Sequence, residues 1–119
     1  MSIHAQIQTD LAYIAGLFDG EGHIGFYNYR ASKNGRKYAR LVVGITNTHH
    51  AVLEWVREVV GTGRIQLKRT RAEGWKDCYS LIIQGQSARK FLTETLPYLK
   101  VKREKAILML SQRTYGRVQ

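Results

Sequence analysis

Cysteine and proline are nearly absent from this 119-residue sequence, which contains one of each. The single cysteine, Cys78, cannot form a disulfide within the chain, and it excludes a zinc site built from several thiolates. No segment approaches the roughly 18 consecutive apolar residues that a membrane-spanning helix needs, and residues 1–8 lack the apolar centre of a signal peptide. These absences favour an intracellular protein that has no contact with a membrane.

Acidic residues are also scarce, since nine Asp and Glu stand against nineteen Lys and Arg and give a formal net charge of +10. Two stretches, 22–53 and 59–72, contain no acidic residue although each contains several cations. Most carboxylates fall in segments predicted below as helices, so we expect one positive face and one face of mixed charge. Such a surface favours a polyanionic partner, because each neutralised phosphate releases condensed counterions. Charge alone leaves open whether that partner is DNA or RNA.

The length and the apolar content fit a single domain that spans residues 1–119. At 44% hydrophobic residues the composition is ordinary for a folded chain, and a chain of 119 residues can bury one modest core. No internal repeat, low-complexity run or linker divides the sequence, so we expect one structural unit.

Apolar spacing predicts secondary-structure elements in the order α-β-β-α-β-β-α-α. Capping residues, glycines and one proline supply the boundaries of the helices, and an Asn-Gly pair marks the first hairpin turn. The predicted elements are a helix capped by Asp10 and ended by Gly20 and Gly22, strands 23–30 and 38–46, a helix capped by Asn47 or Thr48, strands 64–70 and 78–84, a helix capped by Ser87 and ended by Pro97, and a helix over 101–110.

Alternation within the predicted strands indicates a sheet that is covered on one face only. In the second strand, Leu41, Val43 and Ile45 point to one side and the residues between them to the other. In the third strand, Ile65 and Leu67 point inward, whereas the fourth strand is apolar on both sides and its orientation stays open. Two hairpins, each followed by a helix, predict an α+β fold with helices on one sheet face. The open basic face suits a DNA major groove.

Residues 14–22 resemble the nonapeptide that names the LAGLIDADG homing endonuclease family. The residues that match it outright are Ala15, Gly16, Leu17, Asp19 and Gly22. A second segment, 97–102 (Pro-Tyr-Leu-Lys-Val-Lys), is similar to the Pro-Phe-Leu-Lys-hydrophobic-Lys segment of homodimeric family members. Together with the order of the elements, the resemblance covers nearly the whole chain. It implies the family's αββαββα fold, in which the antiparallel sheet is saddle-shaped.

The first predicted helix has a second face of small residues, on which Tyr13, Gly16 and Gly20 lie. A small face lets another helix approach closely, and in the family two such helices pack side by side. Because the motif occurs once, the resemblance implies a symmetric homodimer, with Asp19 hydrogen-bonded to the partner helix. The implied interface residues are Tyr13, Gly16, Leu17, Asp19 and Gly20.

The resemblance also implies a metal-dependent active site at the end of this helix. Glu21 aligns with the acid whose carboxylate binds the catalytic ion, and the Gly20 carbonyl is the implied backbone ligand. Oxygen ligands suit Mg²⁺, which Mn²⁺ or Ca²⁺ can replace for binding, and phosphodiester hydrolysis uses such an ion to activate water. Lys102 aligns with a lysine near the scissile phosphate. Asn47 aligns with a residue in the outer solvent shell of the metal, although it is equally suited to cap the following helix.

For DNA contact, we nominate polar residues predicted to point outward from the sheet. Arginine pairs with guanine, and asparagine or glutamine with adenine, in the major groove, whereas phosphate contacts position the protein. The nominated base-reading residues are Asn28, Arg30, Arg40, Gln66 and Lys68, and the nominated phosphate contacts are Lys37 and Arg71. Family members often carry a basic residue near the positions of His49 and His50, and the role of these two histidines stays open.

The sequence therefore predicts a homing endonuclease that acts as a homodimer and cleaves both strands of a long, nearly palindromic double-stranded DNA site. The resemblance to the family also implies that an intron encodes it. Two alternatives share the same composition. One is a nuclease-inactive family member, either an RNA maturase or a DNA-binding regulator, and the retained Glu21 and Lys102 argue against it. The other is a general RNA-binding module, which would be a monomer in solution.

Overall fold

The computed structural model describes residues 3–30, 37–68 and 77–112. The elements are α1 (Ile3–Glu21), β1 (Gly22–Arg30), β2 (Lys37–Asn47), α2 (His50–Val60), β3 (Arg64–Lys68), β4 (Cys78–Gln84), α3 (Gln86–Thr95), the 3-10 helix η1 (Leu96–Tyr98) and α4 (Arg103–Leu110). The strands form one four-stranded antiparallel sheet in the order β1-β2-β4-β3. The predicted order of helices and strands is confirmed, with η1 added between α3 and α4.

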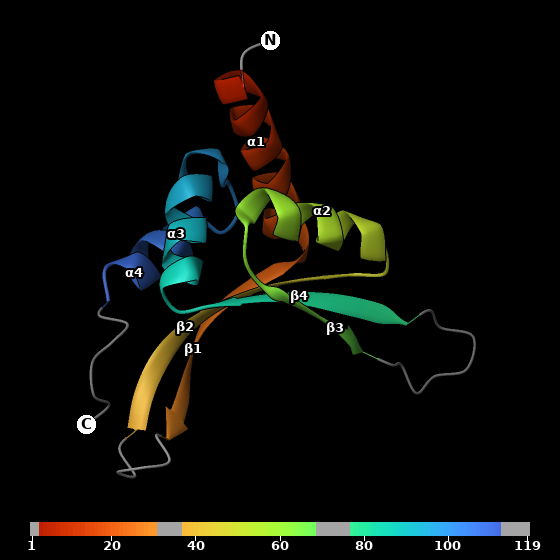
Figure 1. The fold of residues 1–119 in the computed structure, drawn as a ribbon. Helices are drawn as coiled ribbons and strands as arrows, with labels where there is room; N and C mark the ends of the chain where they lie inside the picture. Colours follow the sequence, from red (N-terminus) through yellow and green to blue (C-terminus); the bar gives the residue numbers. More distant parts are fainter. Residues whose placement is uncertain (1–2, 31–36, 69–76, 113–119) are drawn as a thin grey trace.

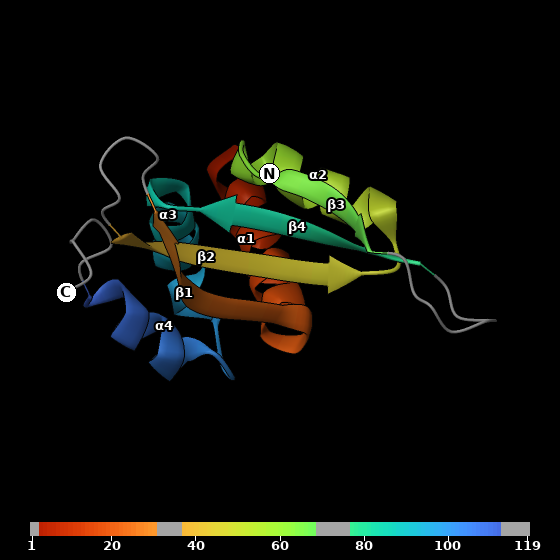
Figure 2. The same ribbon diagram turned by 90° about the horizontal axis from the view of Figure 1, so that it is seen from below.

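The helices and the sheet form two layers. Figure 1 shows α1, α2 and α3 above the sheet. Figure 2 shows the opposite face, over which none of the described helices lies, with α4 alongside the β1 edge. The far end of the β1–β2 hairpin bends away from the helices (Figure 1). The α+β fold with one open sheet face is thus confirmed. Within the described residues no helix has the length and apolarity needed to cross a bilayer.

Strand pairing decides which residues face the helices, because directly opposed residues of an antiparallel pair share one face. Leu41, Val43 and Ile45 are buried beneath the helices, as predicted. Leu81 and Ile83 of β4 pair with Ile45 and Val43 and are buried with them. The pairing therefore settles the orientation of β4, which its own apolar pattern leaves open.

The core ties the end of α1 to α3. Phe18 is fully buried, and its ring meets that of Phe91 edge to face, with the ring centres 5.0 Å apart. Gly22 follows α1 directly and packs against the same ring, since a Cβ at this position would lie 2.2 Å from Cδ1 of Phe18. A glycine is required for this close approach, so helix α1 passes into strand β1 without a loop.

Helix α1 begins earlier than predicted. It starts at Ile3, so the predicted cap Asp10 lies inside the helix, where it accepts a hydrogen bond from Nε2 of Gln6 at 3.0 Å. The first turns project beyond the other helices (Figure 1), and Gln6 and Ile7 are exposed. Ile3 and Ile7 continue the helical spacing of Leu11, Ile14 and Phe18, so the longer helix was readable in the sequence, and the choice of Asp10 as cap placed its start too late.

The other helix boundaries differ from the predictions by a few residues. The N-cap of α2 is His49, whose Nδ1 accepts a backbone hydrogen bond at 3.1 Å, whereas Asn47 ends strand β2. Ser87 lies inside α3, which follows Gly85 at φ 66°. Helix α4 begins at Arg103 rather than at residue 101.

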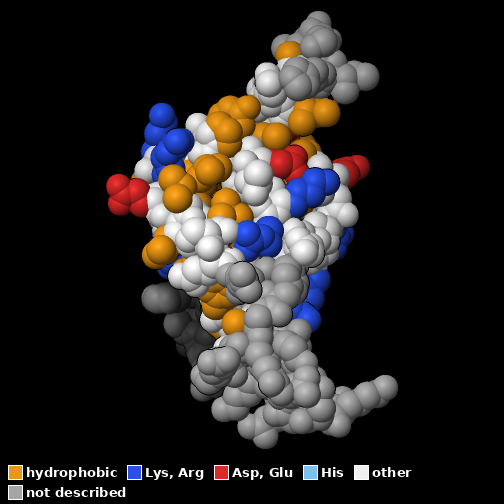
Figure 3. Space-filling view, turned by 90° about the vertical axis from the view of Figure 1, so that its left-hand side faces the viewer, with side chains coloured by type: hydrophobic (Ala, Val, Ile, Leu, Met, Phe, Trp, Pro, Cys, Tyr) orange, Lys and Arg blue, Asp and Glu red, His pale blue; other side chains and the backbone are white. Residues whose placement is uncertain are grey.

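Helix α4 is fastened to α3 by Arg89. Its guanidinium group donates hydrogen bonds to the backbone oxygens of Leu110 at 2.6 Å and Gln112 at 3.0 Å, at the end of α4. Figure 3 shows apolar side chains among Lys and Arg on the side of the molecule where α3 and α4 lie. Ile107 and Leu108 of α4 are among the exposed apolar residues. Ala106, in the middle of α4, is fully buried, so the helix also packs on the core between these exposed residues.

Candidate functional site

The Glu21 side chain is exposed at the junction of α1 and β1, and Asn47 holds its carboxylate group. Nδ2 of Asn47 donates to Oε2 of Glu21 at 2.6 Å, while Oδ1 of Asn47 accepts from the backbone N–H of His49 at 2.8 Å. Because the amide oxygen faces a donor, the amide nitrogen must face Glu21. His49 caps α2, so a chain of hydrogen bonds joins the carboxylate to the start of that helix.

Lys102 lies at the same end of α1. Its Nζ donates to the backbone oxygen of Asp19 at 2.7 Å. The last carbonyls of a helix lack partners within the helix, and they form the negative end of its dipole, so an ammonium group stabilises this end. The structure thus brings together three predicted site residues from separate segments around the C-terminus of α1, namely Glu21, Asn47 and Lys102.

In the single chain, Asp19 binds the segment that carries Lys102, and its hydrogen bond to a partner helix stays a prediction. Its Oδ2 accepts from the backbone N–H of Lys100 at 2.6 Å, and its Oδ1 accepts from that of Lys102 at 2.9 Å. Burial would raise the pKa of Asp19, but these donors, the Val101 N–H and the Lys102 charge hold the pKa below its usual value. Both oxygens therefore have partners in the same chain, and Asp19 fixes the segment that carries Lys102.

The outer face of α1 is open in one chain. Tyr13 is 60% exposed, and a Cβ placed at Gly16 or Gly20 would meet no other atom within 4 Å. Leu17 is partly buried against the core. Beside this face lies a mainly apolar groove between α1 and α2, where the ring of Tyr13 meets that of Trp55 at 5.5 Å. A second helix could approach this face closely, and the residues predicted for the dimer interface stay a prediction.

The open sheet face carries most of the described residues that were nominated for DNA contact. Arg40 lies opposite Tyr27 on this face, and its Nη1 donates to Oε1 of Gln84 on β4 at 3.1 Å. Gln66 and Lys68 of β3 lie on the same face, because they alternate with the partly buried Ile65. Their predicted position is confirmed, while their contact with DNA stays a prediction. Leu67, which was predicted to point inward, is 44% exposed because it lies near the end of the strand.

Asn28 differs from its prediction. It pairs with Ala39 and shares the alternation of Ile24 and Phe26, which face the helices. The predicted alternation of β1 was therefore offset by one residue. Asn28 is exposed because the hairpin extends beyond the helices (Figure 1), and Tyr27, 53% exposed, lies on the open face instead.

The remaining nominated residues are only partly covered by the structure. Arg30 and Lys37 pair with each other at the end of the β1–β2 hairpin, and their side chains lie outside the described part. Arg71 lies outside the described residues. The functions predicted for these three residues therefore stay predictions.

The sequence pattern did not single out His23, which lies on the open face at the start of β1. It pairs with Gly44, where a Cβ would lie 2.2 Å from Cε1 of the imidazole ring. Partial burial against the sheet, and then the charges of Lys68, Lys105 and Lys102, lower the pKa of His23. A histidine that closely follows the motif acid is a signal in the sequence, but its pairing with glycine is visible only in the folded sheet.

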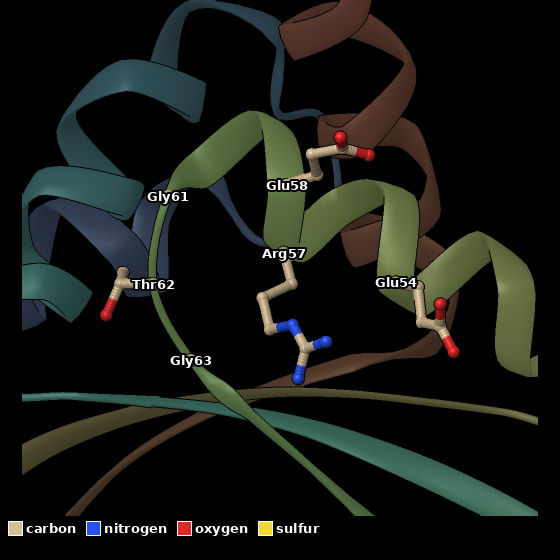
Figure 4. A pocket seen from close by; sticks show the side chains of 6 residues that line it. All are labelled: Glu54, Arg57, Glu58, Gly61, Thr62 and Gly63. Atoms are coloured by element: carbon tan, nitrogen blue, oxygen red, sulfur yellow. The ribbon is translucent and has the colours of Figure 1, made fainter.

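A separate hollow between α2 and the start of β3 contains none of the predicted site residues (Figure 4). Arg57 points toward the sheet, while Glu54 and Glu58 lie along the same helix. The hollow has mixed charge, and its lining residues include none from the junction of α1 and β1. We therefore place the candidate site at that junction and on the open sheet face.

The fold and this junction define a LAGLIDADG-type protein. The sequence pattern of the LAGLIDADG-like domain matches residues 8–95, more than half of the chain, and the chain therefore belongs to this family. The DNA endonuclease I-CvuI of Chlorella vulgaris is 29% identical over 106 residues, which cover 87% of this chain and 63% of I-CvuI. The chain thus spans less than two thirds of that relative.

Solved structures give the same result for the fold. The crystal structure of I-CvuI in complex with its target, in the presence of Ca, superimposes with a TM-score of 0.71 at 25% identity, over 89% of this chain and 66% of that one. The archaeal intron-encoded homing endonuclease I-Vdi141I, complexed with DNA, gives a TM-score of 0.67 at 22% identity, over 87% and 65%. The α+β architecture is therefore that of known homing endonucleases.

Proposed function

We propose that this chain is one subunit of a homodimeric homing endonuclease that cleaves both strands of a specific DNA site with a divalent metal ion. The observation that carries the proposal is the exposed Glu21 carboxylate at the end of α1, which Asn47 holds at 2.6 Å. The relative I-CvuI is named a DNA endonuclease, and its crystal structures contain its own target in the presence of Ca and the uncleaved I-CreI target in the presence of Mg.

The Glu21 carboxylate and the Gly20 carbonyl would hold the metal ion. Both are hard oxygen donors, and the carbonyl belongs to the last turn of α1, where backbone oxygens lack helical partners. In the part of the chain that the structure describes, no three His, Cys, Asp or Glu side chains gather as a metal site. One chain thus offers few protein ligands, and the α1 end of a second chain would add to them. Mg²⁺ suits such a site, since it keeps several waters when bound by few carboxylates.

The bound ion would activate water and neutralise charge on the scissile phosphate. The protein itself positions the groups around that phosphate. Asn47 orients the Glu21 carboxylate, and Asp19 fixes the backbone of Lys102 beside it. The ammonium group of Lys102 would stabilise negative charge that develops on the phosphate oxygens.

A homodimer follows from the open face of α1. Gly16 and Gly20 leave space over this helix, and the Tyr13–Trp55 groove extends the surface toward α2. Helices whose contact residues are small pack with their axes close together. Two copies related by a twofold axis would place their Glu21 residues at the same end of the helix pair. Such a dimer suits a nearly palindromic DNA site.

The open sheet face is the proposed DNA-binding surface. Arg40, Gln66 and Lys68 share this face, and none of the described helices covers it (Figure 2). Arginine and glutamine side chains there are suited to base edges in the major groove.

We also propose an intron origin, for which the DNA that flanks the reading frame is the test. The junction of the spliced exons is then the expected target.

Cleavage of a randomised duplex library tests the proposed function. We expect the protein to cut a small set of related, nearly palindromic duplexes in Mg²⁺, to lose this activity in EDTA, and to regain it when Mg²⁺ is restored. Specific binding without cleavage under any metal condition would favour the nuclease-inactive alternative. Absence of specific DNA binding would contradict the proposal altogether.

A further inference from the structure

His23 lies on the open sheet face next to the candidate metal site, and its ring packs against the paired strand β2. Its side chain is exposed, and its ring lies against the backbone of Gly44 on the neighbouring strand. The absence of a side chain at Gly44 is required for this arrangement, since a Cβ there would overlap the ring. The imidazole is therefore held by the sheet and presented to whatever lies on the open face.

The position along the chain relates His23 to the cleaved bond. His23 is the second residue of β1 and follows Glu21, the last residue of α1, by two positions, so their backbones lie at most about 7 Å apart. Phosphates of one DNA strand are spaced by about 3.4 Å along the helix axis. An ion held by Glu21 over the scissile phosphate would thus place His23 within about two nucleotide steps of that bond.

The surroundings of His23 favour a phosphate as its partner. The imidazole is acted on by the charges of three lysines. They are Lys68 in β3, Lys102 just before α4, and Lys105 in α4. Lys102 is anchored at the end of α1 through the Asp19 carbonyl. These lysines come from both edges of the sheet, since β3 is one edge strand and α4 lies alongside the other (Figure 2). Together they produce a positive potential at this point, which attracts the DNA backbone.

We propose that the imidazole of His23 donates a hydrogen bond to a phosphate of the cleaved strand, within about two nucleotide steps of the cut. This inference rests on the proposed function. It adds a substrate-contacting residue that positions the strand over the metal site. Imidazole nitrogen atoms donate well to phosphate oxygens, and a ring held against Gly44 loses little freedom on binding.

The test uses a duplex recovered from the randomised library. Phosphates around the cut are replaced one at a time by uncharged methylphosphonate, and binding is measured in Ca²⁺. We expect His23→Ala to weaken binding of the unmodified duplex by about tenfold. Replacement of one central phosphate should weaken binding by the wild type to a similar degree and leave binding by His23→Ala unchanged.

Two further variants separate this contact from a structural effect. His23→Asn retains an N–H donor and should recover part of the lost affinity. Tyr27→Phe, on the same face and strand but farther from the cut, should show no coupling to that phosphate. If the wild type cuts DNA but no central phosphate couples to His23, the inference is wrong while the proposed function stands. If the wild type neither binds nor cuts any duplex, the proposed function itself fails.

Discussion

At the scale of single residues, the Asn47 amide group joins two parts of the site. It donates to Glu21 and accepts from the His49 N–H, so its orientation is fixed on both sides. A carboxylate that is held in one orientation loses less freedom when it binds an ion, and partners of metal ligands strongly affect affinity. Asn47 is therefore a positioning residue for Glu21 in the proposed mechanism.

Replacement of Asn47 should weaken metal use more than DNA binding. We expect Asn47→Ala to lower the cleavage rate by about 10- to 100-fold and to raise the Mg²⁺ concentration needed for half-maximal rate. Single-turnover cleavage across a Mg²⁺ titration measures both quantities. The neighbouring exposed residue provides a control, Thr48→Ala, which should retain the wild-type titration. An unchanged titration in Asn47→Ala would show that this contact does not position Glu21.

Asp19 should contribute stability that depends on pH. Its folded-state pKa is lowered, so the contribution is present above the unfolded pKa, about 3.9, and is lost as the pH falls through the folded value. We expect Asp19→Asn to reduce the free energy of unfolding by about 1 kcal/mol at pH 7. Urea unfolding at pH 7 and pH 3 should show the difference shrinking at the lower pH. A difference that is the same at both would contradict this role.

At the scale of elements, alternation and periodicity predicted the helices and strands but left their registers undecided. In β1 both alternating sets contain aromatic residues, Phe26 in one and Tyr27 in the other, so the apolar pattern alone could not show that Asn28 faces the helix side. In β4 the same ambiguity was removed only by pairing with Ile45 and Val43. Registers depend on neighbouring strands, which a single segment does not reveal.

The candidate site was predictable only in part, for a similar reason. The nonapeptide identified Glu21, and the resemblance identified Lys102 and Asn47 as candidates. The hydrogen bonds of Asp19 to residues 100 and 102 join segments far apart in the sequence, so no local pattern predicts them. Asn47 was equally suited to cap α2, and in the structure its amide bonds to Glu21 while His49 provides the cap.

The junction of α1 and β1 should tolerate no side chain at Gly22. A Cβ there would lie 2.2 Å from Phe18 Cδ1 and 2.6 Å from its backbone oxygen, so both the core and the helix end must shift. We expect Gly22→Ala to lower the free energy of unfolding by about 2 kcal/mol. Urea unfolding measures this change, and Gly25→Ala in β1 is the control, since a Cβ at Gly25 would meet its nearest atom, Cε2 of Tyr27, at 3.4 Å, which is ordinary van der Waals contact. Equal stability of Gly22→Ala and the wild type would contradict the tight packing of the junction.

At the scale of the whole molecule, dimerisation through α1 can be separated from folding. A large side chain at Gly16 has space in one chain but would block the approach of a second helix. We expect Gly16→Trp to sediment as a monomer and to lose double-strand cleavage, while its circular dichroism spectrum matches that of the wild type. Thr93→Trp, at an exposed position of α3, should remain a dimer. A dimeric Gly16→Trp would place the interface elsewhere.

In the proposed mechanism, two chains share a metal-dependent cleavage site whose acid is Glu21. The most direct test is cleavage of the selected duplex in Mg²⁺ by the wild type and by Glu21→Gln, with DNA binding measured on the same preparations. Glu94→Gln, which makes the same change of charge on α3, is the matched control. We expect Glu21→Gln to bind DNA within a few-fold of the wild type and to cleave at least about 100-fold more slowly, with Glu94→Gln unaffected. Cleavage by Glu21→Gln at the wild-type rate would remove Glu21 from the mechanism.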